Sequence, residues 1–276
     1  MTAEAPALLD VRGLRKVFRG SRGAEVVAVD DVSFTLAKGE SLAVVGESGS
    51  GKTTVARMLV GLVPATSGSI AIGGVERVAD SVGRRERRAR AREMQLVFQD
   101  PYGSLDPRQS VQSAIGEILR QHHGLDKRAA AARVSELLDQ VGLDERAGKA
   151  LPRNLSGGQR QRVVIARSLA AEPEILILDE AVAALDVSVQ AQILNLLTDI
   201  RERTQVAYLF ISHDLAVVRQ IAERAMVMRN GKIVEAGSTD QLLDAPEHPY
   251  TKELRAAVPG PGWAPRRRPA GAVGAE

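Results

Sequence analysis

A glycine-rich stretch at residues 44–54 constrains the fold of this chain more than any other feature. An apolar strand ends at Val45, and the residues after it fit the phosphate-loop pattern G-x-x-x-x-G-K-[ST]. The loop consists of Gly46, Glu47, Ser48, Gly49, Ser50, Gly51, Lys52, Thr53 and Thr54. Glycine permits backbone conformations that side chains forbid, so successive N–H groups can converge on phosphate oxygens at a helix N-terminus. We expect Lys52 to reach the β- and γ-phosphates and Thr53 to hold Mg²⁺.

The sequence around this loop supports it against the alternative of a chance glycine-rich turn. A strand precedes the loop, and a helix with apolar residues at helical spacing follows it. The chain has 276 residues, of which 44% are hydrophobic, enough for one substantial core and a subdomain. It has no cysteine, which excludes disulfides and thiolate metal sites. We expect no secretory signal, because the sequence at 1–6 has no basic n-region or long apolar core, and no membrane span, because no apolar run approaches about 18 residues.

Carboxylates follow a second apolar strand, at Asp179 and Glu180. The four apolar residues before them, 175–178, are typical of a parallel strand that is buried on both faces. Such strands end at the edge of the sheet that carries the phosphate loop. Asp179 therefore suits the Mg²⁺ shell, and Glu180 suits orienting or deprotonating water.

Two further strands end in polar residues at this predicted edge. The strand at 207–211 leads to His213, for which we favour a contact to the terminal phosphate over a purely structural function. The strand that begins at Met94 leads to Gln99, whose amide could touch Mg²⁺ or the attacking water. The alternative for Gln99 is an ordinary turn residue.

A second helix N-terminus occurs at Ser156, after a stretch from 109 to 141 with helical periodicity. Ser156 has the chemistry of an N-cap, and Gly157, Gly158 and Gln159 expose backbone N–H groups at the start of the helix. A second anion site in one chain is useful if it serves a phosphate that another subunit presents. The alternative is an ordinary capped helix.

The N-terminal third contains short strand patterns at 8–11, 25–29 and 32–36, which predict an antiparallel layer. Phe18 stands among basic residues, where it could stack on a flat base or belong to the core. The densest basic run, 84–92, has almost no aromatic residues beside it, and the net charge is only +3. A solvated helix face is therefore favoured over contact with nucleic acid or anionic lipid, and no nucleic-acid partner is expected.

Taken together, these motifs resemble the nucleotide-binding subunit of an ATP-binding cassette (ABC) transporter over about residues 8–258. The resemblance assigns a family motif to each stretch: Walker A to 46–54, the Q-loop to Gln99, the LSGGQ signature to 155–159, Walker B to 175–179, the catalytic glutamate to Glu180, the D-loop end to 184–186 with Asp186, the switch histidine to His213, and adenine stacking to Phe18. It implies ATP and Mg²⁺ as cofactors, with Thr53, Gln99 and Asp179 at the metal.

The same resemblance implies the fold class and the domain organisation. The class is α/β, a P-loop NTPase (RecA-like) core with an antiparallel β-subdomain and an inserted α-helical signature subdomain. We expect an ABC ATPase domain at 1–258, divided as follows: nucleotide core at about 8–98 and 171–245, helical subdomain at about 99–170, C-terminal helix at about 246–258. The segment 259–276 has the composition of a disordered tail.

The sequences at 98–108, 185–193 and 248–251 resemble those of the dipeptide/oligopeptide importer ATPases, a group that includes nickel and glutathione systems. This implies uptake of peptides or similar small solutes, with a second ABC ATPase subunit, two transmembrane permeases and an extracytoplasmic solute-binding protein as partners. It places the chain at the cytoplasmic face of the cell membrane. A non-transport cassette acting on ribosomes or nucleic acid, and an exporter subunit, are the alternatives. The chain departs from the family at 181–183, Ala-Val-Ala, where a proline and a hydroxyl are common.

Overall fold

The computed structural model describes residues 7–20, 24–77 and 84–257, without the side chains of 84–88. In chain order the elements are β1 (Ala7–Arg19), β2 (Glu25–Ala37), β3 (Ser41–Val45), α1 (Lys52–Leu59), β4 (Ser67–Ile72), β5 (Val75–Glu76), α2 (Arg84–Glu93), β6 (Met94–Val97), α3 (Val111–His123), α4 (Lys127–Gln140), α5 (Glu145–Lys149), the 3-10 turn η1 (Pro152–Asn154), α6 (Gly157–Leu169), β7 (Ile175–Asp179), α7 (Val187–Thr204), β8 (Ala207–Ser212), α8 (Leu215–Ile221), β9 (Arg224–Arg229), β10 (Lys232–Ser238), α9 (Thr239–Asp244) and α10 (Pro249–Ala256). The predicted tail at 259–276 lies outside the described residues.

The centre of the molecule is a six-stranded sheet with the order β10-β9-β3-β8-β7-β6. All neighbours pair in parallel except β9 and β10, which form an antiparallel hairpin. Strands β3, β7 and β8 are buried along their whole length, as their continuous apolar runs predict. The phosphate loop, the carboxylates and His213 therefore all follow carboxyl ends of adjacent parallel strands.

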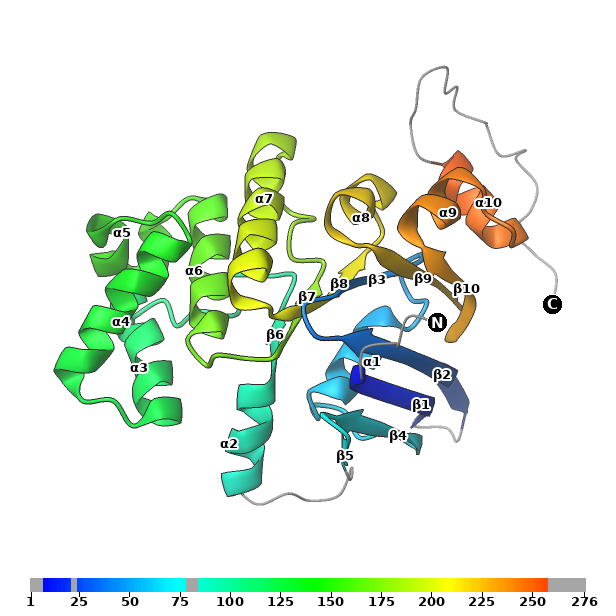
Figure 1. Ribbon diagram of the computed structural model, residues 1–276, viewed down its shortest axis with the longest axis horizontal. Coiled ribbons are helices and arrows are strands. Elements are labelled where there is room, and N and C mark those ends of the chain that lie inside the picture. The colour runs from blue at the N-terminus through cyan, green and yellow to red at the C-terminus, as the bar shows by residue number, and fades with distance from the viewer. Residues whose placement is uncertain (1–6, 21–23, 78–83, 258–276) are drawn as a thin grey trace, which may run out of the picture.

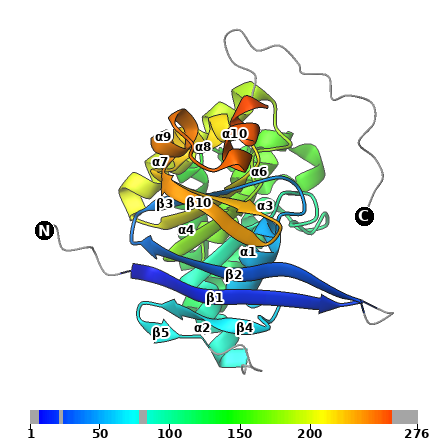
Figure 2. The same ribbon diagram turned by 90° about the vertical axis from the view of Figure 1, so that its right-hand side faces the viewer.

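The two faces of this sheet belong to two separate hydrophobic cores. Along β7, Leu176 and Leu178 pack with the helices of one face, whereas Ile175 and Ile177 pack with α1 and the N-terminal strands on the other. This alternation is the two-residue period of a strand. Figure 2 shows the resulting layers, with the large sheet between the N-terminal strands and the helices.

The second sheet is antiparallel, with the order β2-β1-β4-β5, and here the predicted boundaries are wrong. The separate strands expected at 25–29 and 32–36 are one bulged strand, β2, and the expected strand at 8–11 extends to Arg19 as β1. Asp31 adopts the left-handed conformation, with φ 56°, at an irregularity in the pairing. The Asp30-Asp31 pair thus supplies the positive φ of a bulge rather than a reversal of the chain.

Helices α3 to α6 gather beyond the β6 edge of the large sheet, at the left of Figure 1. They pack on one another through buried residues such as Ile115, Leu137 and Ile165. At the opposite end, β9 and β10 meet at a turn where Asn230 and Gly231 have φ values of 49° and 79°, as the Asn-Gly pair predicts.

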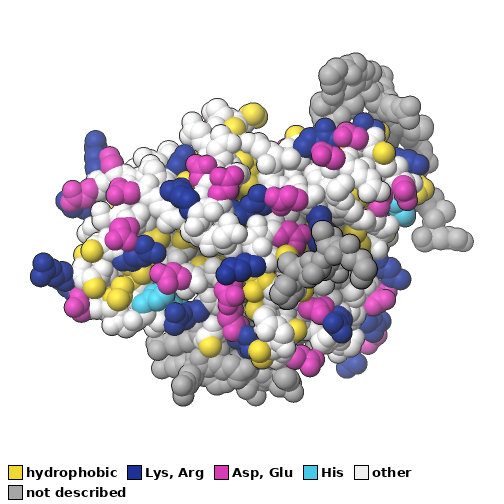
Figure 3. Space-filling model, in the orientation of Figure 1, with side chains coloured by type: hydrophobic (Ala, Val, Ile, Leu, Met, Phe, Trp, Pro, Cys, Tyr) yellow, Lys and Arg dark blue, Asp and Glu magenta, His cyan; other side chains and the backbone are white. Residues whose placement is uncertain are grey.

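The surface in Figure 3 carries basic and acidic side chains intermixed, without a large area of one sign. The basic run predicted to be helical lies in α2. Among the described residues no helix is both long and apolar enough to cross a membrane.

Candidate nucleotide-binding site

The loop between β3 and α1 is shaped by glycines that approach neighbouring backbone closely. A Cβ on Gly46, whose φ is 154°, would lie 2.2 Å from the carbonyl oxygen of Met228 in β9. A Cβ on Gly51, at φ 106°, would lie 2.4 Å from the carbonyl oxygen of Ala28 in β2. Since real Cβ atoms do not approach so closely, only glycine allows the loop to sit against both strands.

Lys52 begins α1 and folds its side chain back along the loop. Its Nζ donates to the carbonyl oxygens of Gly46 (2.7 Å) and Glu47 (2.8 Å) and to Ser50 Oγ (3.4 Å). The residue is only 4% exposed, and burial lowers its pKa, while Glu180, Asp179 and Glu47 oppose that shift. The ammonium is thus held at the mouth of the loop, where it is close to several oxygens and largely shielded from solvent.

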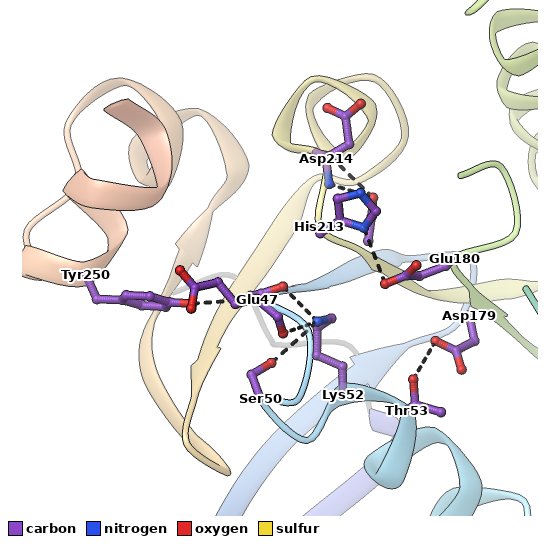
Figure 4. Close-up of polar contacts among 11 residues, drawn as sticks. Glu47, Ser50, Lys52, Thr53, Asp179, Glu180, His213, Asp214 and Tyr250 are labelled. Atoms are coloured by element: carbon purple, nitrogen blue, oxygen red, sulfur yellow. Dashed lines mark hydrogen bonds and ion pairs between the residues drawn. The ribbon is translucent and has the colours of Figure 1, made fainter. Parts of the chain in front are cut away.

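Asp179 ends β7 beside the first turn of α1. The Thr53 hydroxyl donates to Asp179 Oδ1 at 3.1 Å (Figure 4). Burial raises the pKa of Asp179, the Thr53 hydrogen bond opposes this, and the neighbouring Glu180 carboxylate raises it further. The ionised form therefore lacks sufficient compensation within the chain, and a cation at this point would supply it.

The oxygens of Asp179 and Thr53 fit Mg²⁺, which prefers hard oxygen donors and commonly binds through one or two carboxylates plus substrate phosphates. Among the residues the structure describes, no group of three His, Cys, Asp or Glu could hold a metal by itself. A magnesium ion here would accordingly need the oxygens of a bound nucleotide as well.

Glu180 follows Asp179 in a backbone conformation unusual for a residue with a side chain, with φ 49°. Its N–H still donates to the Ile211 carbonyl at 2.9 Å, so the sheet holds the backbone while the side chain turns to the loop. Glu180 Oε1 lies 3.3 Å from Nδ1 of His213, which follows β8 and has a side chain that is 58% exposed (Figure 4). Outlying backbone of this kind is concentrated at functional sites.

The other two residues expected near the nucleotide, Gln99 and Phe18, are exposed. Gln99 is exposed and follows the end of β6 in a bend. Phe18 is 42% exposed near the end of β1, where it pairs with Val26 of β2, two residues from the Ala28 carbonyl under Gly51. Lys16 Nζ lies 5.0 Å from the centre of the Phe18 ring, so one face of this ring already carries a cation.

The second helix N-terminus, at Ser156, is not part of this cluster. Its capping box is complete: Ser156 Oγ accepts from the Gln159 N–H at 3.2 Å, and Gln159 Oε1 accepts from the Ser156 N–H at 2.9 Å. Figure 1 shows α6 and α1 on different sides of β6 and β7.

The signature glycines pack instead on the chain around Asp186. A Cβ on Gly158 would lie 2.5 Å from Val189, and one on Gly157 would lie 3.7 Å from Leu185. Asp186 caps α7, accepting from the Val189 N–H at 2.9 Å. The signature and D-loop segments thus form one unit, apart from the phosphate loop of their own chain.

Two contacts to the phosphate loop were not foreseen from the sequence. The Gly231 N–H donates to the Ser50 carbonyl at 2.9 Å, and the Glu47 N–H donates to the Tyr250 hydroxyl at 3.1 Å. The segment His248 to Thr251 resembles the importer ATPases, but its sequence does not indicate a contact with the loop.

The fold and this loop define a P-loop nucleotide-binding protein. The chain matches the family described as "ABC transporter" over residues 29–183. It is 50% identical to a putative peptide import ATP-binding protein of Brucella abortus (strain 2308) over 234 residues, which are 84% of this chain and 69% of that protein. The chain therefore belongs to the ABC transporter family and is an ATPase cassette of it.

Other relatives agree. The chain is 51% identical to the glutathione import ATP-binding protein GsiA of Escherichia coli (strain K12) over 235 residues, 85% of this chain and 37% of that protein. Among solved structures it is similar to the ATP-binding cassette MJ0796, a dimer in a post-hydrolysis state bound to ADP and Pi, with a TM-score of 0.75, 26% identity, and coverage of 84% of this chain and 98% of that chain.

CbiO1 of Clostridium perfringens, part of the ABC transporter complex cbiONQ, matches with a TM-score of 0.76, 26% identity, and coverage of 87% of this chain and 91% of that chain. The predicted α/β P-loop NTPase fold is confirmed.

Proposed function

We propose that this chain hydrolyses ATP to drive the import of peptides or similar small solutes through partner permeases. The observation that carries the proposal is the convergence of Lys52, Thr53, Asp179 and Glu180 at the carboxyl ends of two strands of one sheet. Relatives at about half identity named peptide import and glutathione import ATP-binding proteins support the direction of transport and the class of solute.

In this proposal the phosphates of ATP bind the amides of residues 46–54 and the ammonium of Lys52. Lys52 would turn part of its donor capacity to phosphate oxygens, a stronger charge-assisted pairing, while the Gly46 carbonyl keeps the ammonium at the loop. Mg²⁺, when bound, neutralises charge on the phosphates, and Thr53, Asp179 and Gln99 are the residues that would hold it. Adenine stacks on the ring face of Phe18 that Lys16 leaves open.

Glu180 is the proposed general base. Its carboxylate projects from the sheet edge beside the loop, where it can take a proton from water that attacks the γ-phosphate. His213, 3.3 Å away, orients this carboxylate and contacts the terminal phosphate. Gln99, in the bend after β6, orients the water and couples γ-phosphate binding to the helices that follow.

We further infer that each site is completed by a second cassette subunit, identical or homologous. Ser156, Gly157, Gly158, Gln159 and Asp186 would face the ATP held by the phosphate loop of the other subunit. The support is that these residues form a partly exposed unit away from their own loop. A related cassette with ADP and Pi is dimeric.

The full system in this proposal has two permeases and an extracytoplasmic solute-binding protein, with the cassettes at the cytoplasmic face of the membrane. We propose a nucleotide core at 8–98 and 171–245 and a helical subdomain at 99–170. The segment after Gln99, at the start of this helical subdomain, would contact the permeases. A relative in the cbiONQ complex supports assembly with further subunits.

A tagged copy of the chain, purified from detergent-solubilised membranes of its host, tests this function. We expect permease subunits in the purified complex and, after reconstitution in vesicles, ATP-dependent uptake of a labelled dipeptide or glutathione. The Glu180→Gln variant serves as the control that assembles but does not transport. Recovery with ribosomes or DNA, and without permeases, would contradict the proposal.

A further inference from the structure

The phosphate loop has a contact with the C-terminal helix that the proposed reaction has not used. Tyr250, in the first turn of α10, is 2% exposed, and its hydroxyl accepts a hydrogen bond from the Glu47 N–H at 3.1 Å (Figure 4). The two residues are 203 positions apart in the chain. Tyr250 also lies outside the residues 29–183 that match the family.

This contact fixes the orientation of one peptide group in the loop. In a trans peptide the C=O and the N–H point in opposite directions. The peptide between Gly46 and Glu47 directs its N–H outward to Tyr250, so its carbonyl points inward, where the Gly46 oxygen accepts from Lys52 Nζ at 2.7 Å. The phenol and the ammonium therefore hold the two ends of the same peptide plane.

The Tyr250 ring is itself held in place. The Arg229 guanidinium lies 4.5 Å from the centre of the ring, within the range of a cation–π contact. His248 Nδ1 accepts from the Tyr250 N–H at 3.1 Å, and Glu235 accepts from the His248 N–H at 3.1 Å. These contacts connect α10 to strand β10 and to the end of β9, so the hydroxyl reaches the loop from a helix that is anchored to two strands.

The same part of the chain braces the loop at two other points. The Gly231 N–H donates to the Ser50 carbonyl at 2.9 Å, and the Met228 carbonyl faces Gly46 so closely that a side chain there would collide with it. Both contacts come from backbone, which any sequence with this hairpin could provide. The Tyr250 contact depends on a side chain, so a single substitution can remove it.

We propose that Tyr250 is a positioning residue for ATP binding: its hydroxyl sets the Gly46–Glu47 peptide, which directs the Gly46 carbonyl at Lys52 and presents the loop in its phosphate-binding shape. The proposal rests on the assignment of this loop to ATP. Tyr250 acts through the loop and does not touch the nucleotide.

The test is Tyr250→Phe, which removes the hydroxyl and keeps the ring beside Arg229. Tyr208→Phe is the matched control, because Tyr208 is also a buried tyrosine, and its hydroxyl donates to the Leu197 carbonyl at 2.8 Å on the helical side of the sheet. Both variants lose the hydroxyl of a buried tyrosine and one hydrogen bond to backbone, so a general loss of stability should affect them alike.

We expect Tyr250→Phe to raise the Kd and the KM for ATP by about 2- to 12-fold, the range of one neutral hydrogen bond. Turnover at saturating ATP should change less than KM, because Glu180 and His213 are untouched. Tyr208→Phe should lower Tm and leave the Kd for ATP unchanged. Equal ATP affinity in wild type and Tyr250→Phe, or equal weakening in the two variants, would overturn the proposal.

Two further measurements distinguish failure of the Tyr250 proposal from misfolding and from failure of the nucleotide assignment. If Tyr250→Phe does not fold, Arg229→Met, which frees the ring and keeps the hydroxyl, should weaken ATP in the same direction, and unchanged affinity would refute the proposal. If wild type and Tyr208→Phe both fail to bind ATP, the nucleotide assignment itself is wrong. Normal binding by all variants would leave that assignment standing and remove only Tyr250.

Discussion

The two helix N-termini that the sequence offers as anion sites differ in how completely this chain builds them. At α1, Lys52 and Ser50 are nearly fully buried, and two carboxylates from β7 and the loop after it stand close by. At α6, Ser156 and Gln159 are exposed and hydrogen-bond each other. The first end has a buried cation beside two carboxylates, and the second is a helix end whose capping residues are uncharged.

Each of the two helix ends has a different capacity to bind phosphate by itself. The α1 site has a cation, hydroxyls and loop amides for phosphate oxygens, together with carboxylates for a metal and for water. The α6 site has a helix dipole and backbone amides, which favour an anion but bind it weakly without a cationic side chain. The α6 end is therefore suited to closing a site that is built elsewhere.

Lys52→Ala breaks the α1 site most severely. Removing one partner of a buried, hydrogen-bonded charge pair costs about 2–5 kcal/mol, so ATP affinity should fall by roughly 30-fold to several thousand-fold. Titration with a fluorescent ATP analogue measures the effect. Ser156→Ala is the matched change at the other helix and should leave the affinity of the isolated chain unaltered. Equal losses in both variants would mean that the two ends are not different in kind.

Glu180→Gln separates chemistry from binding within the α1 site. Glutamine keeps the size and the hydrogen-bonding capacity of the side chain but cannot take a proton from water. We expect ATP turnover to fall by about 10²-fold or more, in the range of a lost general base, while ATP still binds. Phosphate release at saturating ATP is the measurement, and turnover at the wild-type rate would remove Glu180 from its proposed function.

Phe18→Ala tests whether the α1 site includes a surface for the base. Base stacking on an aromatic ring contributes about 1–3 kcal/mol, so ATP affinity should fall by roughly 5- to 150-fold, and Phe18→Tyr should bind normally. Affinity for inorganic triphosphate, which has no base, should not change. If alanine and tyrosine variants both bind ATP like wild type, Phe18 belongs to the β1 packing alone.

The smallest effect that we expect is on the pH dependence of stability, to which Asp179 at the α1 site and Asp186 beside the α6 end contribute in opposite directions. The folded state raises the pKa of Asp179, chiefly by burial, so this residue favours folding below its unfolded pKa and costs stability as pH rises through its folded pKa. Backbone amides, first that of Val189, lower the pKa of Asp186, so its contribution is present above the unfolded pKa and is lost as pH falls through the folded value.

At neutral pH, Asp179→Asn should therefore raise the Tm of the nucleotide-free chain, and the gain should fade under acid conditions. Asp186→Asn should give no gain at any pH, because asparagine is also a good N-cap. Thermal unfolding between pH 4 and 8 measures both. A neutral-pH gain from Asp186→Asn, or a loss from Asp179→Asn, would contradict the assigned directions.

The sequence allowed the α1 site to be predicted because its parts are local. β3, β7 and β8 are short continuous apolar runs, and each is followed at once by the residues that matter. The bulge at Asp31 was not predictable, since an Asp pair also favours turns. The contact of Tyr250 with Glu47 joins positions 203 residues apart and follows from packing that no local pattern encodes.

In the proposed assembly, the α6 end of one subunit closes the α1 site of another. Its most direct test is light scattering on purified Glu180→Gln with ATP and Mg²⁺, alone and with the homologous subunit from its host. Because ATP binds across the closed pair and is not hydrolysed, mass action should accumulate a dimer that ADP does not support. Adding Ser156→Arg should abolish this dimer and leave ATP affinity of the monomer unchanged. ATP binding without any ATP-dependent dimer, or a dimer indifferent to Ser156→Arg, would contradict the account.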